Sequence, residues 1–370
     1  MQLRTILALV ASSAWLTAAA PSVDAVDRRA VRLVKTSPED IGTWITEEEK
    51  LVWTAQGKHF VDITDITDPE VLAILSTPNS EDVSLAARAI TYPTSASKQS
   101  TANPLISQVS NSQPQAWLSN LCNFYNRYYR GVNGTAAGNW LFNTVSQVAA
   151  ANPAITVSRF THSFNQPSII VKIPGSSPNL VIVGAHYDST GGSATARAPG
   201  ADDNGSGVVV ILEALRVLAN ARYSPKNTLE FHFYGGEEGG LLGSAAVFSN
   251  YKSTGKNVLA MVNQDMTGYS PGGKITVYTD YVDSGLTAYA RVVATAYTGS
   301  TSSDRCGYAC SDHGSARSNG FPAAYIADEP MSTSSPYIHS PSDAYSTIQW
   351  PAILRHSKFT VAFLVEASFL

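Results

Sequence analysis

The middle of the chain alternates between short apolar runs and longer segments with apolar residues at helical spacing. Residues 179–184, 228–234 and 258–263 are predicted strands, and the first is a continuous apolar run typical of a strand buried on both faces. Residues 206–220 and 241–252 are predicted helices. Strands that alternate with helices predict an α/β fold in which a mixed, mostly parallel β-sheet is sandwiched by helices.

Acidic side chains and one histidine gather where the predicted strands end. The group comprises His186, Asp188, Asp202, Asp203, Glu237, Glu238 and Asp265. The carboxyl ends of the strands in an open α/β sheet lie along one edge, so these side chains should converge there. Carboxylates packed this closely need a counter-charge, and a divalent cation is the simplest one. Imidazole with carboxylates suits Zn²⁺, whereas Mg²⁺ and Ca²⁺ prefer oxygen ligands alone. The alternative is a set of solvated loop acids.

A ligand set of His186, one of Asp202 and Asp203, Glu238 and Asp265 has one histidine and three carboxylates. This set is poor in nitrogen for zinc and calls for a second histidine. The other histidines of the chain are His59, His162, His232, His313, His339 and His356. His339 lies in a turn-rich loop with a carboxylate, Asp343, shortly after it. His232 lies inside a predicted strand and is more typical of a core residue.

The charge balance and the hydropathy exclude several classes of protein. The 370 residues include 25 Lys and Arg against 29 Asp and Glu, so the formal net charge is −4. A nucleic-acid binder usually carries a basic face, and no apolar run reaches the roughly 20 residues that a membrane helix needs. We therefore expect neither nucleic acid nor a membrane among the partners.

The N-terminus has the features of a secretory signal peptide. Arg4 precedes an apolar stretch from Ile6 to Leu16, and small residues follow at 18–20. Residues 1–20 are therefore predicted to be removed, and the mature protein is expected to be secreted into an oxidising, extracellular compartment. The alternative is a buried N-terminal helix.

Residues 21–88 differ in composition from the rest of the chain and are predicted to form a propeptide. This segment ends at Arg88, and a Ser/Thr-rich, linker-like stretch follows to about residue 101. The catalytic domain then occupies residues 89–370. A small N-terminal subdomain that is never removed is the alternative.

Cysteine usage and glycosylation motifs fit a secreted protein. Cys306 and Cys310 are close enough in sequence for a disulfide, which secretion favours, and two free thiols are the alternative. Cys122 is expected to be buried. Asn133 begins a glycosylation motif in a predicted loop. Asn204 begins another, but it lies within the polar group described above.

Six segments together resemble the M28 family of zinc peptidases, and within it the secreted fungal leucine aminopeptidases and similar bacterial two-zinc enzymes. They are GAHYDST, APGADDNGSG, EFHFYGGEEGGLLGS, QDMTGY, CGYACSDH and YIHSPSD, in this order. The similarity extends over about residues 89–368. It implies a zinc-exopeptidase fold, with a single catalytic domain after a propeptide that ends just before a Tyr-Pro pair, here Tyr92-Pro93.

The resemblance also implies two zinc ions per chain and assigns their ligands. By this resemblance Asp203 bridges the two ions. His186 and Asp265 complete one zinc site. Glu238 and His339 complete the other.

Further roles follow from the same resemblance. Glu237 is implied to be the general base. Asp188 is expected to orient His186, and Asp343 to orient His339, because a histidine ligand needs an outer carboxylate to fix its tautomer.

The resemblance places the Cys306–Cys310 bridge around the substrate pocket, where it frames Tyr308. The pocket must be apolar to favour leucine, and we expect Tyr308 and Ile338 to contribute to it. The implied activity is hydrolysis of N-terminal, Leu-like residues from peptides with a free N-terminus, by an enzyme expected to be a monomer.

Several alternatives remain at this point. Two alternatives share the same scaffold: a glutaminyl-peptide cyclotransferase would work with one zinc, and a carboxypeptidase should offer a cation to the substrate carboxylate. An inactive peptide-binding homologue is a more remote alternative than either enzyme. A two-carboxylate glycosidase would leave His186 and His339 without a role. The serine-hydrolase pattern at residues 268–272 contains Pro271, which lacks the N–H that an oxyanion hole would use.

Overall fold

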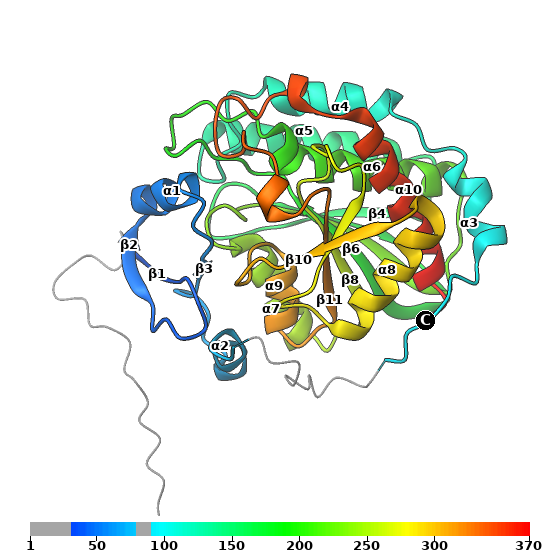
Figure 1. Cartoon of the computed structure of the whole chain (residues 1–370), viewed down its shortest axis with the longest axis horizontal. Coiled ribbons are helices and arrows are strands. Elements are labelled where there is room, and N and C mark those ends of the chain that lie inside the picture. The colour runs from blue at the N-terminus through cyan, green and yellow to red at the C-terminus, as the bar shows by residue number, and fades with distance from the viewer. Residues whose placement is uncertain (1–30, 79–89) are drawn as a thin grey trace, which may run out of the picture.

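The computed structural model describes residues 31–78 and 90–370. The predicted signal peptide and the predicted propeptide boundary at residue 88 lie outside the described residues. Within the described part, a small N-terminal unit (residues 31–78) lies beside a large α/β unit (Figure 1). No helix among the described residues is long and apolar enough to cross a bilayer.

A mixed eight-stranded sheet forms the centre of the large unit, in the order β10-β9-β11-β8-β6-β7-β5-β4. The strands are β4 (Thr156–Phe160), β5 (Ser168–Ile173), β6 (Ser177–His186), β7 (Asn227–Tyr234), β8 (Val258–Gln264), β9 (Ile275–Tyr278), β10 (Thr301–Asp304) and β11 (Ala323–Ala327). The central neighbours β11, β8, β6 and β7 run parallel. β5 is antiparallel to β7, and β9 is antiparallel to β11. The α/β prediction with a mixed sheet is confirmed.

Helices cover both faces of this sheet. They are α3 (Gln99–Ile106), α4 (Ser112–Asn123), α5 (Val132–Ala149), α6 (Gly207–Asn220), α7 (Leu242–Ser253), α8 (Ser284–Thr298), α9 (His313–Ser318) and α10 (Trp350–Ala367). Side chains of α4, α5, α6, α8 and α10 share one large core with the sheet, while α7 and α9 pack on the other face. Alternate residues of β6 serve the two cores: Val181 and Val183 face the first, and Leu180 and Ile182 the second.

The predicted central elements agree closely with the structure. α6 spans Gly207–Asn220 and β7 spans Asn227–Tyr234, within a residue of the predicted limits. Every residue of β7 and β8 is buried, since both strands are covered on both faces. The predicted strand at 179–184 extends in both directions, to Ser177–His186, so His186 is itself the last residue of β6.

The N-terminal unit has its own small sheet. Its elements are β1 (Val31–Lys35), β2 (Thr43–Thr46), α1 (Glu47–Ala55), β3 (Val61–Asp62) and α2 (Pro69–Leu75), and β1 pairs antiparallel with both other strands. α1 begins with a capping box between Thr46 and Glu49. The unit shares an apolar cluster with the large unit, in which Leu33 and Val71 pack with Leu241.

Candidate metal centre

The ends of the central strands and the loops beside them bring the predicted ligand residues to one edge of the sheet. His186 ends β6, and Asp265 directly follows β8. Glu238 lies in the turn between β7 and α7, and Asp203 lies in the turn before α6. His339 comes from the loop between β11 and α10. Parallel strands end at the same edge, which explains why positions more than 150 residues apart in sequence meet there.

Asp203 lies between the two histidines. Its Oδ1 is 3.1 Å from His186 Nε2, and its Oδ2 is 2.9 Å from His339 Nε2. His186 Nε2 is also 3.5 Å from Asp265 Oδ1, and His339 Nε2 is 3.2 Å from Glu238 Oε2. The ligand atoms therefore form two groups, each within 4.8 Å, that share Asp203.

These side chains fit a pair of divalent cations. Both ring nitrogens of His186, Asp265 Oδ1 and Glu238 Oε1 are buried without a hydrogen-bond partner. A native protein rarely leaves so many polar atoms unpaired unless a water or an ion occupies the site. Burial raises the pKa of Glu238 to about 7, and the neighbouring Asp203 adds to this shift. A cation at each group would give these atoms a partner, apart from His186 Nδ1, which faces Asp188. It would also keep the carboxylates ionised.

Asp188 supports two parts of this centre. Its Oδ1 is 3.4 Å from His186 Nδ1. Its two carboxylate oxygens also accept the backbone N–H groups of Glu237 and Glu238, at 3.0 and 3.1 Å. A single buried carboxylate thus faces a ligand histidine and fixes the turn that carries both glutamates.

The Asp343 carboxylate has other partners than His339, which it was expected to orient. Its oxygens accept the backbone N–H groups of Asp202 and Asp203, at 2.8 and 3.0 Å. Because that carboxylate is engaged with the turn before α6, it supports the backbone of Asp203, the residue shared by both ligand groups.

Glu237 lines the cavity beside the ligand groups. Its Oε2 is 3.9 Å from His186 Nε2. Burial raises the pKa of Glu237 well above its usual range; His186 opposes this shift, while Asp312 and Glu238 add to it. A carboxyl group with a raised pKa is suited to exchange protons near neutral pH.

A polar chain behind Asp265 was not anticipated from the sequence. Ser311 Oγ donates to Asp265 Oδ2 at 2.6 Å, and Asn263 Nδ2 donates to Ser311 Oγ at 2.7 Å. Asp312 is also fully buried, and burial raises its pKa to about 7. Ser311 and Asp312 directly follow Cys310, and neither periodicity nor spacing in that segment indicates a contact with Asp265.

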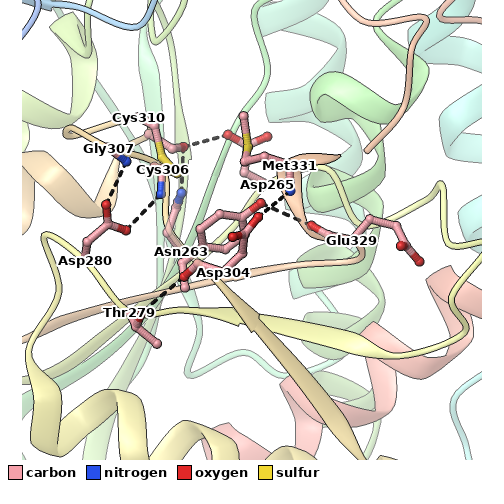
Figure 2. Close-up of a disulfide and its surroundings, with 12 residues drawn as sticks. Asn263, Asp265, Thr279, Asp280, Asp304, Cys306, Gly307, Cys310, Glu329 and Met331 are labelled. Atoms are coloured by element: carbon pink, nitrogen blue, oxygen red, sulfur yellow. Dashed lines mark hydrogen bonds between the residues drawn. A yellow bond between two sulfur atoms is a disulfide. The ribbon is translucent and has the colours of Figure 1, made fainter. Parts of the chain in front are cut away.

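Cys306 and Cys310 are joined by a disulfide, and the loop that they close is held from outside by Asp280 (Figure 2). The Asp280 carboxylate accepts the N–H groups of Cys306 and Gly307, at 2.9 and 2.7 Å. The third cysteine, Cys122, is buried, as predicted.

Tyr308, which was predicted to lie at the substrate pocket, is covered by the N-terminal unit. Its side chain is buried, its hydroxyl donates to the carbonyl of Leu75 in the N-terminal unit, and its ring packs edge-on against Tyr281. It is not among the described residues that line the cavity at the metal centre, whereas Ile338 is. The N-terminal unit covers Tyr308, and this contact could not be inferred from the sequence around Cys306.

The structure also shows the positions of the two glycosylation motifs, of the serine in the hydrolase pattern and of His232. Asn133 lies half-buried in the first turn of α5 instead of in a loop, and Asn204 is fully buried. Ser270 Oγ accepts from Arg355 at 2.6 Å, which gives no support to a serine nucleophile. His232 is a core residue that contacts Glu230 at 3.0 Å, as expected.

Comparisons with known proteins agree with this fold. Residues 168–364 match the model for Peptidase family M28. The chain is 42% identical over 386 residues to leucine aminopeptidase 1 of Arthroderma gypseum, with 99% of each protein covered. The LapA aminopeptidase of Legionella pneumophila has a TM-score of 0.76 at 26% identity, over 88% of this chain and 90% of that chain. A glutaminyl cyclase of Porphyromonas gingivalis, at 20% identity, shares the fold with a TM-score of 0.59, over 70% of this chain and 99% of that chain.

An α/β sheet that gathers histidines and carboxylates at its strand ends, together with these matches, defines a metallo-aminopeptidase, a hydrolase. The chain belongs to peptidase family M28. The resemblance noted in the sequence is confirmed.

Proposed function

We propose that this protein is a secreted aminopeptidase that uses two zinc ions to remove Leu-like apolar residues from peptides with a free N-terminus. The observation that carries the proposal is the position of Asp203, whose two carboxylate oxygens face different histidines, His186 and His339. A carboxylate in this position can offer one oxygen to each of two ions. With imidazole and carboxylate donors in both groups, zinc is the metal that the donor chemistry favours.

The side chains divide the work of hydrolysis. His186, Asp203 and Asp265 would hold one zinc ion, and Asp203, Glu238 and His339 the other. When bound, the ions supply Lewis acidity that acidifies a water molecule and polarises the scissile carbonyl. Glu237 would take the proton from the attacking water and deliver it to the leaving amine, and its raised pKa suits both transfers.

The lining of the cavity supports the preference for apolar residues. Met266, Tyr325, Met331 and Ile338 contribute apolar surface beside the metal groups. Among the described residues that line this cavity, Lys58 of the N-terminal unit is the only lysine or arginine. A carboxypeptidase should instead present a cation from its catalytic unit to the substrate carboxylate, so an aminopeptidase is favoured.

We also propose the division of the chain into a signal peptide at 1–20, a propeptide at 21–88 and a catalytic domain at 89–370. Two observations support a removable segment: residues 31–78 build a sheet of their own, and four of them line the cavity at the metal centre. A segment in that position would hinder substrate entry until it is removed. The mature enzyme is proposed to be a monomer, with Asn133 as its glycosylation site.

The proposed activity is tested by purifying the secreted protein before and after cleavage near residue 88. Metal content per chain and hydrolysis of Leu-p-nitroanilide are measured on both forms. We expect two zinc ions per chain, activity that a strong chelator abolishes, and a large rise in activity on cleavage. A single metal per chain with cyclisation of an N-terminal glutamine would instead indicate a cyclotransferase, and a zinc-loaded, cleaved protein inert on all aminoacyl-p-nitroanilides would refute the proposal.

A further inference from the structure

Arg127 is buried against the loop that joins two of the proposed metal ligands. This loop, residues 187–200, begins directly after His186 and ends three residues before Asp203. His186, Asp203 and Asp265 form one of the two ligand groups. Arg127 lies between α4 and α5, is fully buried, and is not among the described residues that line the cavity. It can therefore act on the ligands without contacting a substrate.

The guanidinium of Arg127 holds both ends of this loop at once. Its Nε donates to the carbonyl of Tyr187 at 2.7 Å. Its Nη2 donates to the carbonyl of Gly200 at 2.9 Å, and its Nη1 donates to the carbonyl of Pro199. A guanidinium is planar and its donors form a rigid fork. The shape of this one side chain therefore sets the spacing between the two ends of the loop.

The loop also fits closely around the arginine. The backbone N–H of Arg127 donates to Ser189 Oγ at 3.0 Å, and Ser189 Oγ donates to the carbonyl of Ala198 at 2.8 Å. A Cβ on Gly200 would lie only 2.6 Å from Arg127 Nη2, so a larger residue there would displace the fork. Because backbone and side chain of Arg127 both bind the loop, a shift of the loop would break several hydrogen bonds together.

Electrostatic attraction does not explain a cation in this place. The guanidinium forms no ion pair with a carboxylate of the described residues, and burial of an unpaired charge is costly. The charges of Asp188 and Asp203 act on it, so it lies close enough to the metal centre to repel a divalent cation. The geometry of its donors accounts for the arginine instead, since a single lysine or glutamine cannot bind these three carbonyls in one plane.

We propose that Arg127 is a positioning residue of the metal centre, which sets the distance between His186 and Asp203 so that both can bind one metal ion. This role rests on the proposed two-metal function. It predicts an asymmetry between the two ions. The group with His186 depends on both ends of the loop, whereas the group with His339 depends only on the end near Asp203. Loss of the fork should therefore weaken the binding of one ion more than that of the other.

The first test compares Arg127→Lys, which keeps the positive charge, with Arg127→Gln, which removes it. Arg197→Lys is the matched control, because Arg197 is an exposed arginine of the same loop and does not line the cavity. The metal-free full chains are titrated with Co²⁺, and the visible absorption of each bound ion is recorded.

Both Arg127 variants should bind one of the two ions about 10–100-fold more weakly than the natural chain, with an altered Co²⁺ spectrum. The other ion should be affected less, and Arg197→Lys should match the natural chain. A lower melting temperature of the metal-free variants with both affinities retained would show that Arg127 only stabilises the fold. Natural affinities in Arg127→Lys would likewise overturn the role of the fork.

A second measurement needs no substitution and therefore does not depend on whether the variants fold. Coupling between two sites is reciprocal, so bound metal must strengthen the hydrogen bonds of Arg127 if these strengthen metal binding. Hydrogen exchange at Arg127 Nε is followed by NMR in the metal-free and the zinc-loaded natural chain. Zinc should slow this exchange about tenfold or more, and equal exchange rates would contradict the proposal.

The outcomes separate this inference from the proposed function. Unchanged metal affinities in Arg127→Lys, with a cleaved natural enzyme that hydrolyses Leu-p-nitroanilide, would refute the role of Arg127 alone. A natural chain that binds fewer than two ions, or a cleaved, zinc-loaded enzyme without aminopeptidase activity, would refute the proposed function.

Discussion

Two adjacent glutamates at this site have different surroundings. Glu238 Oε2 faces His339 at 3.2 Å, whereas Glu237 Oε2 is 3.9 Å from His186. The turn that carries them can form because Gly236 and Gly240 adopt positive φ angles, of 74° and 96°. Residues with a Cβ rarely adopt such angles. Backbone geometry therefore lets neighbouring carboxylates reach different partners.

Replacement of the proposed general base separates chemistry from metal binding. Glu237→Gln should retain both metal ions and reduce kcat by about 10²–10⁴-fold, since the amide cannot accept the proton of the attacking water. Metal analysis and kinetics on Leu-p-nitroanilide check this outcome. A variant with near-normal kcat would show that another group is the base.

We predict that Asp188 positions His186 and the turn that carries the two glutamates. Asp188→Asn leaves an amide NH₂ where a carboxylate oxygen now accepts an N–H, so the glutamate turn and His186 lose part of their support. Metal affinity should fall by about 10–100-fold. Chelator competition measures the affinity. Asp283→Asn, at the N-terminus of α8, should leave it unchanged, because asparagine caps a helix about as well as aspartate.

At the scale of elements, α1 connects the N-terminal unit to the large unit. Glu47 at its start accepts a hydrogen bond from the Tyr129 hydroxyl and pairs with Arg130 at 2.8 Å. On the next turn, Lys50 is buried and pairs with Asp62 at 2.9 Å. Charged groups buried at such an interface make docking sensitive to pH.

The docking of the N-terminal unit should weaken in acid. Burial raises the pKa of Glu47, but Lys50, Tyr129 and Arg130 together lower it below its usual value. A carboxyl whose pKa is lower when docked stabilises docking above its undocked pKa of about 4.3, and this contribution is lost as the pH falls through the docked value. Urea-induced undocking is monitored by limited proteolysis at pH 6 and at pH 3, and the midpoint should fall at the lower pH.

The variant Glu47→Gln provides the control for this pH effect. It should weaken docking at pH 6 by about 1–3 kcal/mol, because the interface loses a charged hydrogen-bond acceptor. Its docking should also depend less on pH between 6 and 3 than that of the natural chain. An identical pH dependence in the two proteins would exclude Glu47 as the responsible group.

At the scale of the whole molecule, the metal centre links segments that are far apart in sequence. Its ligands come from β6, from the ends of β7 and β8, and from loops that precede α6 and α10. Without cations, several buried carboxylates face one another across this edge of the sheet. Metal binding should therefore contribute to the stability of the fold as well as to catalysis.

Removal of the metal should lower the melting temperature of the cleaved enzyme. An ion present at a hundredfold excess over its dissociation constant adds about 2.7 kcal/mol to the free energy of unfolding. Differential scanning calorimetry with and without a chelator measures the shift, and zinc should restore the original temperature. If chelation leaves the melting temperature unchanged, a bound cation does not neutralise the repulsion among the clustered carboxylates.

The sequence by itself determined the alternation of strands and helices, and it predicted that His186 and the acidic residues after the strands gather at one edge. Both depend on local rules: buried strands are continuously apolar, and parallel strands end at one edge. The sequence left the second histidine open, and His339 was assigned only by the family resemblance. The disulfide partners were also close enough in sequence to be paired, with two free thiols as the alternative.

Only the tertiary structure decided the partners of side chains in long loops. Asp343 supports the backbone beside Asp203 instead of His339, and Tyr308 packs beneath the N-terminal unit. Ser311 was given no role, because its partners Asp265 and Asn263 come from a remote segment. The direction of a loop side chain depends on which distant elements pack against the loop, and neither periodicity nor spacing along the chain contains that information.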